Sequence, residues 1–229
     1  MAEGIARKPV QARAEVTRAR ILDVARHHFA DRGFEAANTR YIAGDAEVSH
    51  AMIRYHFGNK DTLWREAVGD MFVRLRKDLG FVDGKPPELE GLDDYRDFLR
   101  RYIYYCARHP EHARIMISES VRGGERLKWM VREYIRPGHE IYAGPTRKHM
   151  ERGEMPNAWQ PSLIFIVTAV CQMPFVLAAE ARELYGIDMQ SDAAIEAHID
   201  SVFAFLLRDP SRMRADWPAL PEWLKNTGG

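Results

Sequence analysis

The sequence predicts an all-α protein built from two helical domains. Apolar residues recur every three or four positions along most of the chain, the spacing that places them on one face of an α-helix. Strand-like alternation bounded by turn residues is nearly absent, and the chain contains no G-x-G-x-x-G, P-loop or H-E-x-x-H motif. Its 229 residues suffice for one large domain or two modest ones, and 46% of them are hydrophobic, which is enough for a core.

The first expected helix covers about residues 15–31. Its apolar residues recur at helical spacing: Ala19, Leu22, Ala25 and Phe29. Gly33 stands just past the end, where a glycine can take the left-handed conformation that releases a helix. Residues 1–14 precede this helix and are expected to form a basic flexible arm.

Two short helices joined by a tight turn are expected next. Asn38 or Thr39 can cap the first of them, and Ser49 can cap the second, which runs to Phe57. This arrangement is the outline of a helix-turn-helix.

A fourth helix and a break complete the N-terminal part. Gly58 ends the third helix, and Asn59 opens a fourth in which apolar residues repeat every four positions. Residues 80–92 then concentrate glycine, proline and acidic residues, which is typical of a domain boundary. We therefore expect a three-helix helix-turn-helix domain over residues 15–79 and a larger helical domain over residues 80–229.

The second domain is expected to contain five helices, bounded mostly by proline and glycine. Their ranges are residues 93–108, 111–121, 125–152, 161–185 and 191–207. Pro137 and Gly144-Pro145 are candidate breaks in the third of these helices. From Ser211 the tail is punctuated by proline, and we expect it to pack as an irregular cover.

Residues 163–179 form a nearly continuous apolar run, with Thr168 and Gln172 as its strong polar interruptions. A helix that spans a membrane needs roughly 20 apolar residues, and the charged Glu180 follows this run directly. A helix that is buried on nearly all sides, at a subunit interface and in a core, fits the run better.

Charge and cysteine content narrow the class of protein. Lys+Arg and Asp+Glu both total 33, so attraction to a polyanion must come from a local excess of charge. Such an excess occurs in residues 1–20, which carry five basic and two acidic side chains. A solvated, disordered arm that binds no polyanion is the alternative interpretation of the same charges.

The first twenty residues show no secretory signal, and Cys106 and Cys171 lie far apart in apolar stretches, so we expect a cytoplasmic protein with reduced thiols.

The helix that ends at Phe57 carries the most informative surface. Ile53 and Phe57 are four positions apart and share the face toward the body of the domain. The opposite face therefore turns outward His50, Ala51, Arg54 and Tyr55. These residues offer hydrogen-bond donors and small groups, which suits a helix that lies in a DNA major groove.

Several motif fragments follow one another over about sixty residues. They are R-x-x-I-L-x-x-A-x-x-x-F at 18–29, R-G-F at 32–34, T-x-x-I-A at 39–43, A-x-V-S at 46–49, Y-H-F at 55–57, and N-K-D at 59–61 before Leu63. In order and spacing, residues 15–77 resemble the DNA-binding domain of TetR-family transcriptional regulators. The chain departs from the family pattern at two places. In the turn, Glu47 replaces the usual glycine, and a left-handed conformation there would cost about 1 kcal/mol of stability. In the following helix, Ile53-Arg54 replaces the common leucine-tyrosine.

The resemblance implies a set of residues that face DNA: Thr39, Arg40, Ser49, His50, Ala51, Arg54, Tyr55, His56 and Lys60. Hydroxyl groups, helix N-termini and the Lys60 ammonium suit phosphates, whereas the start of the third helix lies where base edges would be read. Half-buried structural roles are the alternative for Tyr55 and His56.

The resemblance also implies a homodimer, in which helices near 161–185 and 191–207 of two subunits form a four-helix bundle. It further implies a small, largely apolar or aromatic effector within the second domain. The candidate effector-binding residues are Tyr105, Met116, Trp129, Phe165, Thr168, Gln172 and Phe175, with Tyr102, Tyr134, His139 and Tyr142 as further candidates. Ordinary core packing is the alternative for each. The last two helices weakly resemble those of pyrimidine-sensing repressors of the family, which also carry a glutamine here.

Together these patterns predict a dimeric DNA-binding repressor that an effector releases from a pseudopalindromic operator. Helix four and Pro86-Pro87 would form the lever between the domains. We expect no cofactor and no metal, since His109 and His112 straddle Pro110 and other histidines are isolated. A nucleoid or division regulator without an effector is the alternative, and a helical enzyme is a further one for which the sequence shows no catalytic spacing.

Overall fold

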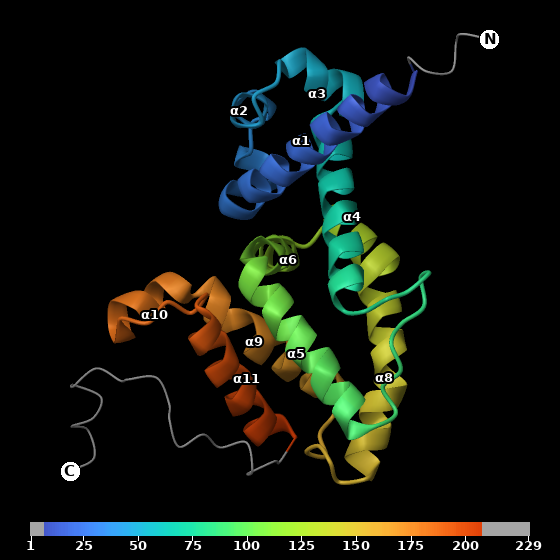
Figure 1. The fold of residues 1–229 in the computed structure, drawn as a ribbon, viewed down its shortest axis with the longest axis vertical. Helices are drawn as coiled ribbons and strands as arrows, with labels where there is room; N and C mark the ends of the chain where they lie inside the picture. The colour runs from blue at the N-terminus through green and yellow to red at the C-terminus, as the bar shows by residue number, and fades with distance from the viewer. Residues whose placement is uncertain (1–6, 208–229) are drawn as a thin grey trace. The chain divides into compact units, whose positions relative to one another are not determined.

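The computed structural model describes residues 7–207 of the chain (Figure 1). The regular elements in this range are helices, and the one isolated β-bridge joins Val82 to Lys85 within a turn. The predicted all-α class is confirmed. The expected tail cover from Ser211 and the first six residues of the expected arm lie outside the described residues.

The chain divides into two compact units. The first contains the residues up to 74 together with 114–122, and the second contains 75–113 and the residues from 123 onward. Two helices, α4 (Lys60–Asp78) and α6 (Pro110–Arg122), therefore contribute residues to both units.

The first unit begins with α1 (Arg7–Ala36), followed by α2 (Thr39–Asp45), α3 (His50–Phe57) and most of α4. Helix α1 starts eight residues before the expected start at residue 15, so residues 7–14 of the expected arm are helical in the structure. Alanine, arginine and glutamine are common in this stretch, and their helix propensity favours the helix.

Three helices and the start of a fourth enclose the core of this unit. The buried apolar side chains are Ile21, Ala25, Phe29, Ile42, Ile53, Phe57, Leu63, Trp64 and Ala67. Arg26 is also buried, and its guanidinium donates hydrogen bonds to the carboxylates of Asp23 and Asp70. Because a buried charge without a partner is strongly destabilising, this cluster ties α1 to α4.

The second unit consists mainly of long helices. They are α5 (Leu92–Arg108), α7 (Glu125–Met130), α8 (Arg136–Glu151), α9 (Gln160–Val176), α10 (Ala178–Tyr185) and α11 (Asp192–Leu206), with a π-helical turn at Val131–Ile135 between α7 and α8. The expected helix over residues 125–152 is therefore interrupted at this turn. Pro137 lies in the first turn of α8, which tolerates proline, and the helix continues through Pro145, so the candidate break at Gly144-Pro145 is wrong.

The expected helix over residues 161–185 is also divided. It ends at Val176, and α10 leaves it at an angle of 64°. Pro174 lies just before this bend and removes a backbone hydrogen bond there. Within the described range no single helix is long and apolar enough to cross a membrane. Helices α9 and α10 taken together across their bend have sufficient length and apolar composition.

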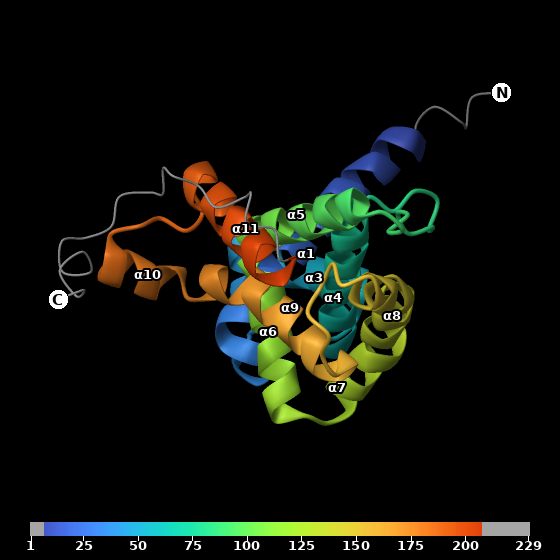
Figure 2. The same ribbon diagram turned by 90° about the horizontal axis from the view of Figure 1, so that it is seen from below.

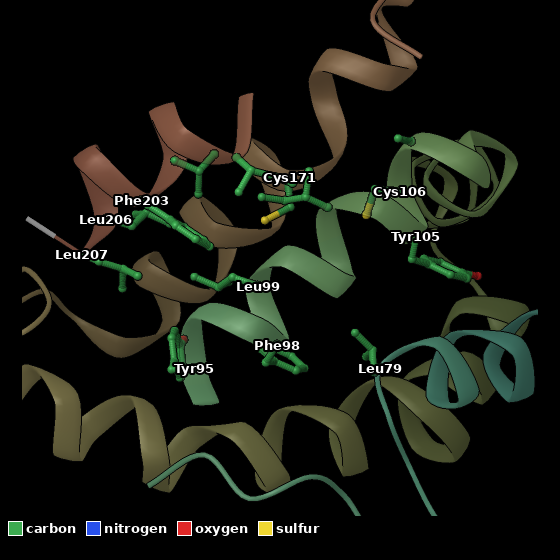
Figure 3. Close-up of a cluster of buried hydrophobic side chains, with 14 of the residues drawn as sticks. Leu79, Tyr95, Phe98, Leu99, Tyr105, Cys106, Cys171, Phe203, Leu206 and Leu207 are labelled. Carbon is green, nitrogen blue, oxygen red and sulfur yellow. The ribbon is translucent and has the colours of Figure 1, made fainter. Parts of the chain in front are cut away.

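The core of the second unit lies between α5, α9 and α11, which are side by side in both views (Figures 1 and 2). Leu99 from α5, Cys171 from α9 and Phe203 from α11 point toward one another in Figure 3. All three are buried, so α5 is the central helix of this core. Both thiols of the chain are free and buried.

A buried histidine holds the segment between α4 and α5. His149, in the last turn of α8, places Nε2 3.1 Å from the carbonyl oxygen of Leu89 and Nδ1 2.6 Å from a carboxylate oxygen of Glu154. A carbonyl oxygen only accepts, so Nε2 donates to Leu89. The contact anchors the segment that carries Pro86-Pro87 within the second unit.

Candidate nucleic-acid interface

The two short helices of the first unit begin and end as the sequence predicts. Asn38 Oδ1 accepts a hydrogen bond from the backbone N of Arg40 at 2.9 Å, and Ser49 Oγ accepts one from Met52 N at 3.3 Å. Each bond satisfies a donor that the first turn of a helix leaves without a partner. Gly58 has φ +72° and ends α3.

The turn between α2 and α3 contains the predicted backbone strain. Glu47 has φ +50°, a left-handed conformation that a residue with a Cβ atom adopts at a cost. Backbone hydrogen bonds from Glu47 N to Gly44 O at 3.0 Å and from Val48 N to Ala43 O at 2.9 Å hold this conformation. The Glu47 carboxylate is exposed and lies 3.7 Å from Arg20.

Helix α3 presents one face to the core and another to solvent. Ile53 and Phe57 are 2% and 3% exposed, whereas Tyr55 is 80% exposed. Ala51 and Arg54 are also exposed, and the helix carries no acidic residue. Ala51, Arg54 and Tyr55 of the predicted outward face are therefore exposed, whereas His50 is half-buried, and the exposed residues form a surface of donors and small groups that suits a major groove.

His50 is tied to the neighbouring helix. Its Nε2 lies 3.0 Å from Thr39 Oγ1, so the first residues of α2 and α3 are joined by a side-chain hydrogen bond. Both residues are partly buried, while Arg40 beside them is exposed. The bond holds the His50 ring in place next to the exposed Ala51, where a base edge would be read.

The aromatic residues at the end of α3 have different environments. His56 is partly buried, with its ring 5.1 Å from that of Tyr55 and 5.9 Å from that of Phe57. Its Nε2 is buried and has no hydrogen-bond partner in the described part of the chain. A half-buried structural role therefore fits His56, whereas the exposure of Tyr55 fits contact with DNA.

Lys60 makes intramolecular contacts at the start of α4. Its Nζ donates to the carbonyl oxygen of Glu35 at 2.9 Å and lies 4.7 Å from the centroid of the Phe34 ring. These contacts join α4 to the end of α1. They also fix the position of the ammonium group, which the sequence suggested as a phosphate contact.

Helix α2 carries an exposed aromatic residue that was not predicted from the sequence. Tyr41 in α2 is 61% exposed, and the Arg32 guanidinium lies 5.7 Å from its ring centroid. The sequence could have predicted the exposure of Tyr41, because its position between Arg40 and the buried Ile42 places it away from the core.

Three of the candidate effector residues belong to the core of the second unit. Tyr105 is buried, and its hydroxyl oxygen lies 2.8 Å from Nδ1 of His112, whose pKa burial lowers to about 4. Phe175 is 1% exposed. Gln172 donates from Nε2 to the Tyr102 hydroxyl at 2.7 Å, so its amide has the partner that burial demands.

The other four candidates do not join them in one site. Phe165 lies on the solvent side of α9 and is 73% exposed, so it does not line the core of a single chain. Met116 belongs to the first compact unit. Trp129 packs edge-on against Tyr134 at a ring distance of 5.4 Å, and Thr168 is partly buried.

Residues 7–207 contain no group of three or more His, Cys, Asp or Glu side chains that could hold a metal ion.

The arrangement of α2 and α3, with a capped second helix and an exposed outer face, defines a helix-turn-helix DNA-binding domain. Residues 21–67 match the domain described as "Bacterial regulatory proteins, tetR family". Residues 21–67 therefore form a DNA-binding domain of the TetR-family type.

The chain is also similar to named regulators over most of its length. It is 29% identical over 192 residues to the HTH-type transcriptional repressor SCO4008 of Streptomyces coelicolor, which covers 82% of this chain and 92% of that protein. A crystal structure of a HlyIIR mutant matches with a TM-score of 0.61 at 22% identity, over 85% of this chain and 99% of that one.

A TetR-like transcriptional regulator from Rhodococcus sp. RHA1 matches with a TM-score of 0.56 at 20% identity, over 82% of this chain and 92% of that one. At these identities the likeness to the solved structures concerns the fold, which combines an N-terminal helix-turn-helix domain with a larger helical domain.

Proposed function

We propose that this chain is a dimeric repressor that binds a pseudopalindromic operator and is released by a small, largely apolar or aromatic effector. The exposed outer face of α3 carries this proposal, because Ala51, Arg54 and Tyr55 are turned to solvent on a helix held by two core residues. Arg54 serves phosphates or base edges, and Ala51 permits close approach of the helix to the groove.

Dimerisation follows from the geometry of operator recognition. One copy of α3 reads one half-site, and two copies must lie about 34 Å apart to read successive half-sites on one side of the duplex. Helices α9 and α11 supply the proposed interface, since Phe165 and Phe205 are 73% and 69% exposed and Ile166 is 41% exposed. Exposed aromatic side chains on neighbouring apolar helices suit a self-complementary two-fold contact.

Release from DNA requires the effector to favour a state of the dimer with the wrong spacing between recognition helices. A change in operator affinity of about 5–150-fold corresponds to about 1–3 kcal/mol of coupling. Helix α4 and the segment with Pro86-Pro87 are the proposed lever, because α4 contributes residues to both compact units. The Gln172–Tyr102 pair supplies polar groups for an effector in an otherwise apolar core.

The dimer is tested by sedimentation of the full-length protein. Phe165→Glu and Phe205→Glu should produce monomers that bind an operator much more weakly, because a charge cannot be buried in an apolar interface. Val121→Glu is the matched control, since Val121 is 83% exposed on α6, outside the proposed interface. Dimers that survive both substitutions would contradict the assignment of the interface.

Induction is tested by operator affinity with and without a saturating effector found by screening. A loss of affinity supports release, whereas unchanged affinity at saturation removes the induction model and leaves a DNA-binding regulator without an effector.

A further inference from the structure

A strained acidic residue lies in the turn of the helix-turn-helix. Glu47 has φ +50° between α2 and α3, a conformation that glycine would adopt without a Cβ clash. Its side chain is 82% exposed and forms an ion pair with Arg20 across 3.7 Å. An ion pair at such an exposed site contributes little to stability. Because strained residues cluster at functional sites, the carboxylate is a candidate for a role in binding.

Arg20 of α1 brings a positive charge to the same turn. Its side chain is 48% exposed beside Glu47. Arg18, two positions earlier, instead pairs with Glu66 of α4 and lies 5.6 Å from the centroid of the Phe57 ring. The acidic partner of Arg20 is much more exposed than that of Arg18, at 82% against 33%. The guanidinium of Arg20 can therefore exchange Glu47 for an anion that arrives from solvent.

The turn also lies at the end of α3 that approaches DNA. Recognition helices contact base edges with their N-terminal residues, and Ser49, which caps α3, is two residues after Glu47. The residues just before this end therefore lie near the phosphates that border the groove. Arg13, seven positions before Arg20, is exposed on the same face of α1, so this face carries a second positive charge.

A carboxylate and a phosphate compete for the same guanidinium. Arginine forms paired hydrogen bonds with either group. While Glu47 holds Arg20, the two charges cancel and the pair adds no attraction to a polyanion. The effect is the same for every DNA sequence, because backbone contacts carry no direct information about the bases.

We propose that Arg20 binds a phosphate of the DNA backbone and that Glu47 competes with this phosphate for the guanidinium. The Arg20–Glu47 pair thereby weakens binding to DNA of any sequence and leaves base reading to α3. The inference rests on the proposed function, because DNA is the ligand, and it adds a phosphate contact outside the set that the resemblance implies.

Salt titrations of the full-length protein with a DNA duplex of arbitrary sequence test the competition. Glu47→Gln removes the competing charge and keeps the Cβ atom, so the strain in the turn is unchanged. We expect binding to tighten about threefold to eightfold at 0.1 M salt. The upper value follows because one phosphate contact changes the salt slope by about 0.9, which is about eightfold between 1 M and 0.1 M. A duplex enriched by selection should show the same factor.

A double-substitution cycle separates competition from simple charge repulsion. In an Arg20→Gln protein, Glu47→Gln should tighten binding by less than about twofold, since no guanidinium is left for the carboxylate to hold. Asp31→Asn is the matched control, because it also removes an acid from an exposed arginine pair of the same unit, 3.0 Å from Arg114. Equal gains from Glu47→Gln with and without Arg20, or an equal gain from Asp31→Asn, would overturn the assignment.

The two kinds of duplex keep this inference and the proposed function apart. If the wild-type protein enriches a pseudopalindrome but Glu47→Gln changes neither titration, only the phosphate contact is removed. If no sequence is enriched but the gain that depends on Arg20 persists on the arbitrary duplex, the repressor function is removed and the contact stands.

Discussion

The two compact units of this protein stabilise their helices in different ways. In the first unit, side chains cap both short helices, with Asn38 before α2 and Ser49 before α3. In the second unit, α7, α8, α9 and α10 begin without a side-chain cap. Helix α5 begins with a hydrogen bond from Gly91 N to Asp94 Oδ2, and α11 has a cap from Ser191. Local hydrogen bonds therefore define the DNA-binding helices, whereas burial in a larger core defines most helices of the second unit.

The units also differ in the polar groups that they bury. The first buries the charged Arg26 between two carboxylates. The second buries Glu111 together with mostly neutral groups, including His112 beside Tyr105 and Gln172 beside Tyr102. Acid should therefore act on the second unit through His112, and the cost of removing a helix cap should depend on how many hydrogen bonds the capping side chain makes.

Stability should change most when a large side chain is removed from either core. Trp64→Ala in the first unit and Phe175→Ala in the second should each lower the free energy of unfolding by about 3–5 kcal/mol, because both side chains are 1% exposed. Urea unfolding followed by circular dichroism measures this. Val73→Ala on α4 is the control, since Val73 is 65% exposed and should cost less than about 0.5 kcal/mol.

Acid should destabilise the second unit through His112. Burial lowers its pKa to about 4 in the folded protein, against 6.5 when exposed, so the unfolded state binds more protons between these values. Stability should fall as the pH is lowered from about 6.5 to 4, by about 3 kcal/mol in total. His112→Gln should remove most of this slope, whereas His27→Gln, on the exposed side of α1, should leave it in place.

The cap serines allow the same small change to be made in both units. Ser49→Ala should cost about 1 kcal/mol of stability. Ser191→Ala should cost more, because its hydroxyl accepts from Ala194 N and also donates to the carbonyl of Asp188 at 2.7 Å. Equal losses, or a larger loss at Ser49, would show that capping is not what distinguishes the two helices.

The smallest effect is expected at the strained turn. Glu47→Gly should stabilise the protein by up to about 1 kcal/mol, since glycine adopts φ +50° without a Cβ clash. Glu47→Ala removes the same carboxylate but keeps the Cβ atom, so it should give little gain. A comparable gain from both substitutions in thermal unfolding would assign the effect to the lost charge and not to the backbone.

The first unit was largely predictable because its signals are local. Asn38, Ser49 and Gly58 lie at the ends that they define, and Glu47 takes the left-handed conformation that the family pattern suggested. The Thr39–His50 bond was not foreseen, because it joins residues eleven apart whose contact depends on the packing of the two helices.

In the second unit the sequence located the helices but not their irregularities. The π-helical turn at Val131–Ile135 contains no proline or glycine, so no residue signals it. The exposure of Phe165 was missed because α9 is apolar around its whole circumference and has no polar face to orient it.

The proposed repressor function requires α3 to read a specific DNA sequence. Selection of DNA by the purified protein across a salt series tests this most directly, with Tyr55→Ala and the exposed Val73→Ala compared at each salt concentration. We predict enrichment of a pseudopalindrome, with affinity reduced about 5–150-fold by Tyr55→Ala and unchanged by Val73→Ala. Binding that follows salt alone, with no enriched sequence and no effect of Tyr55→Ala, would contradict the claim.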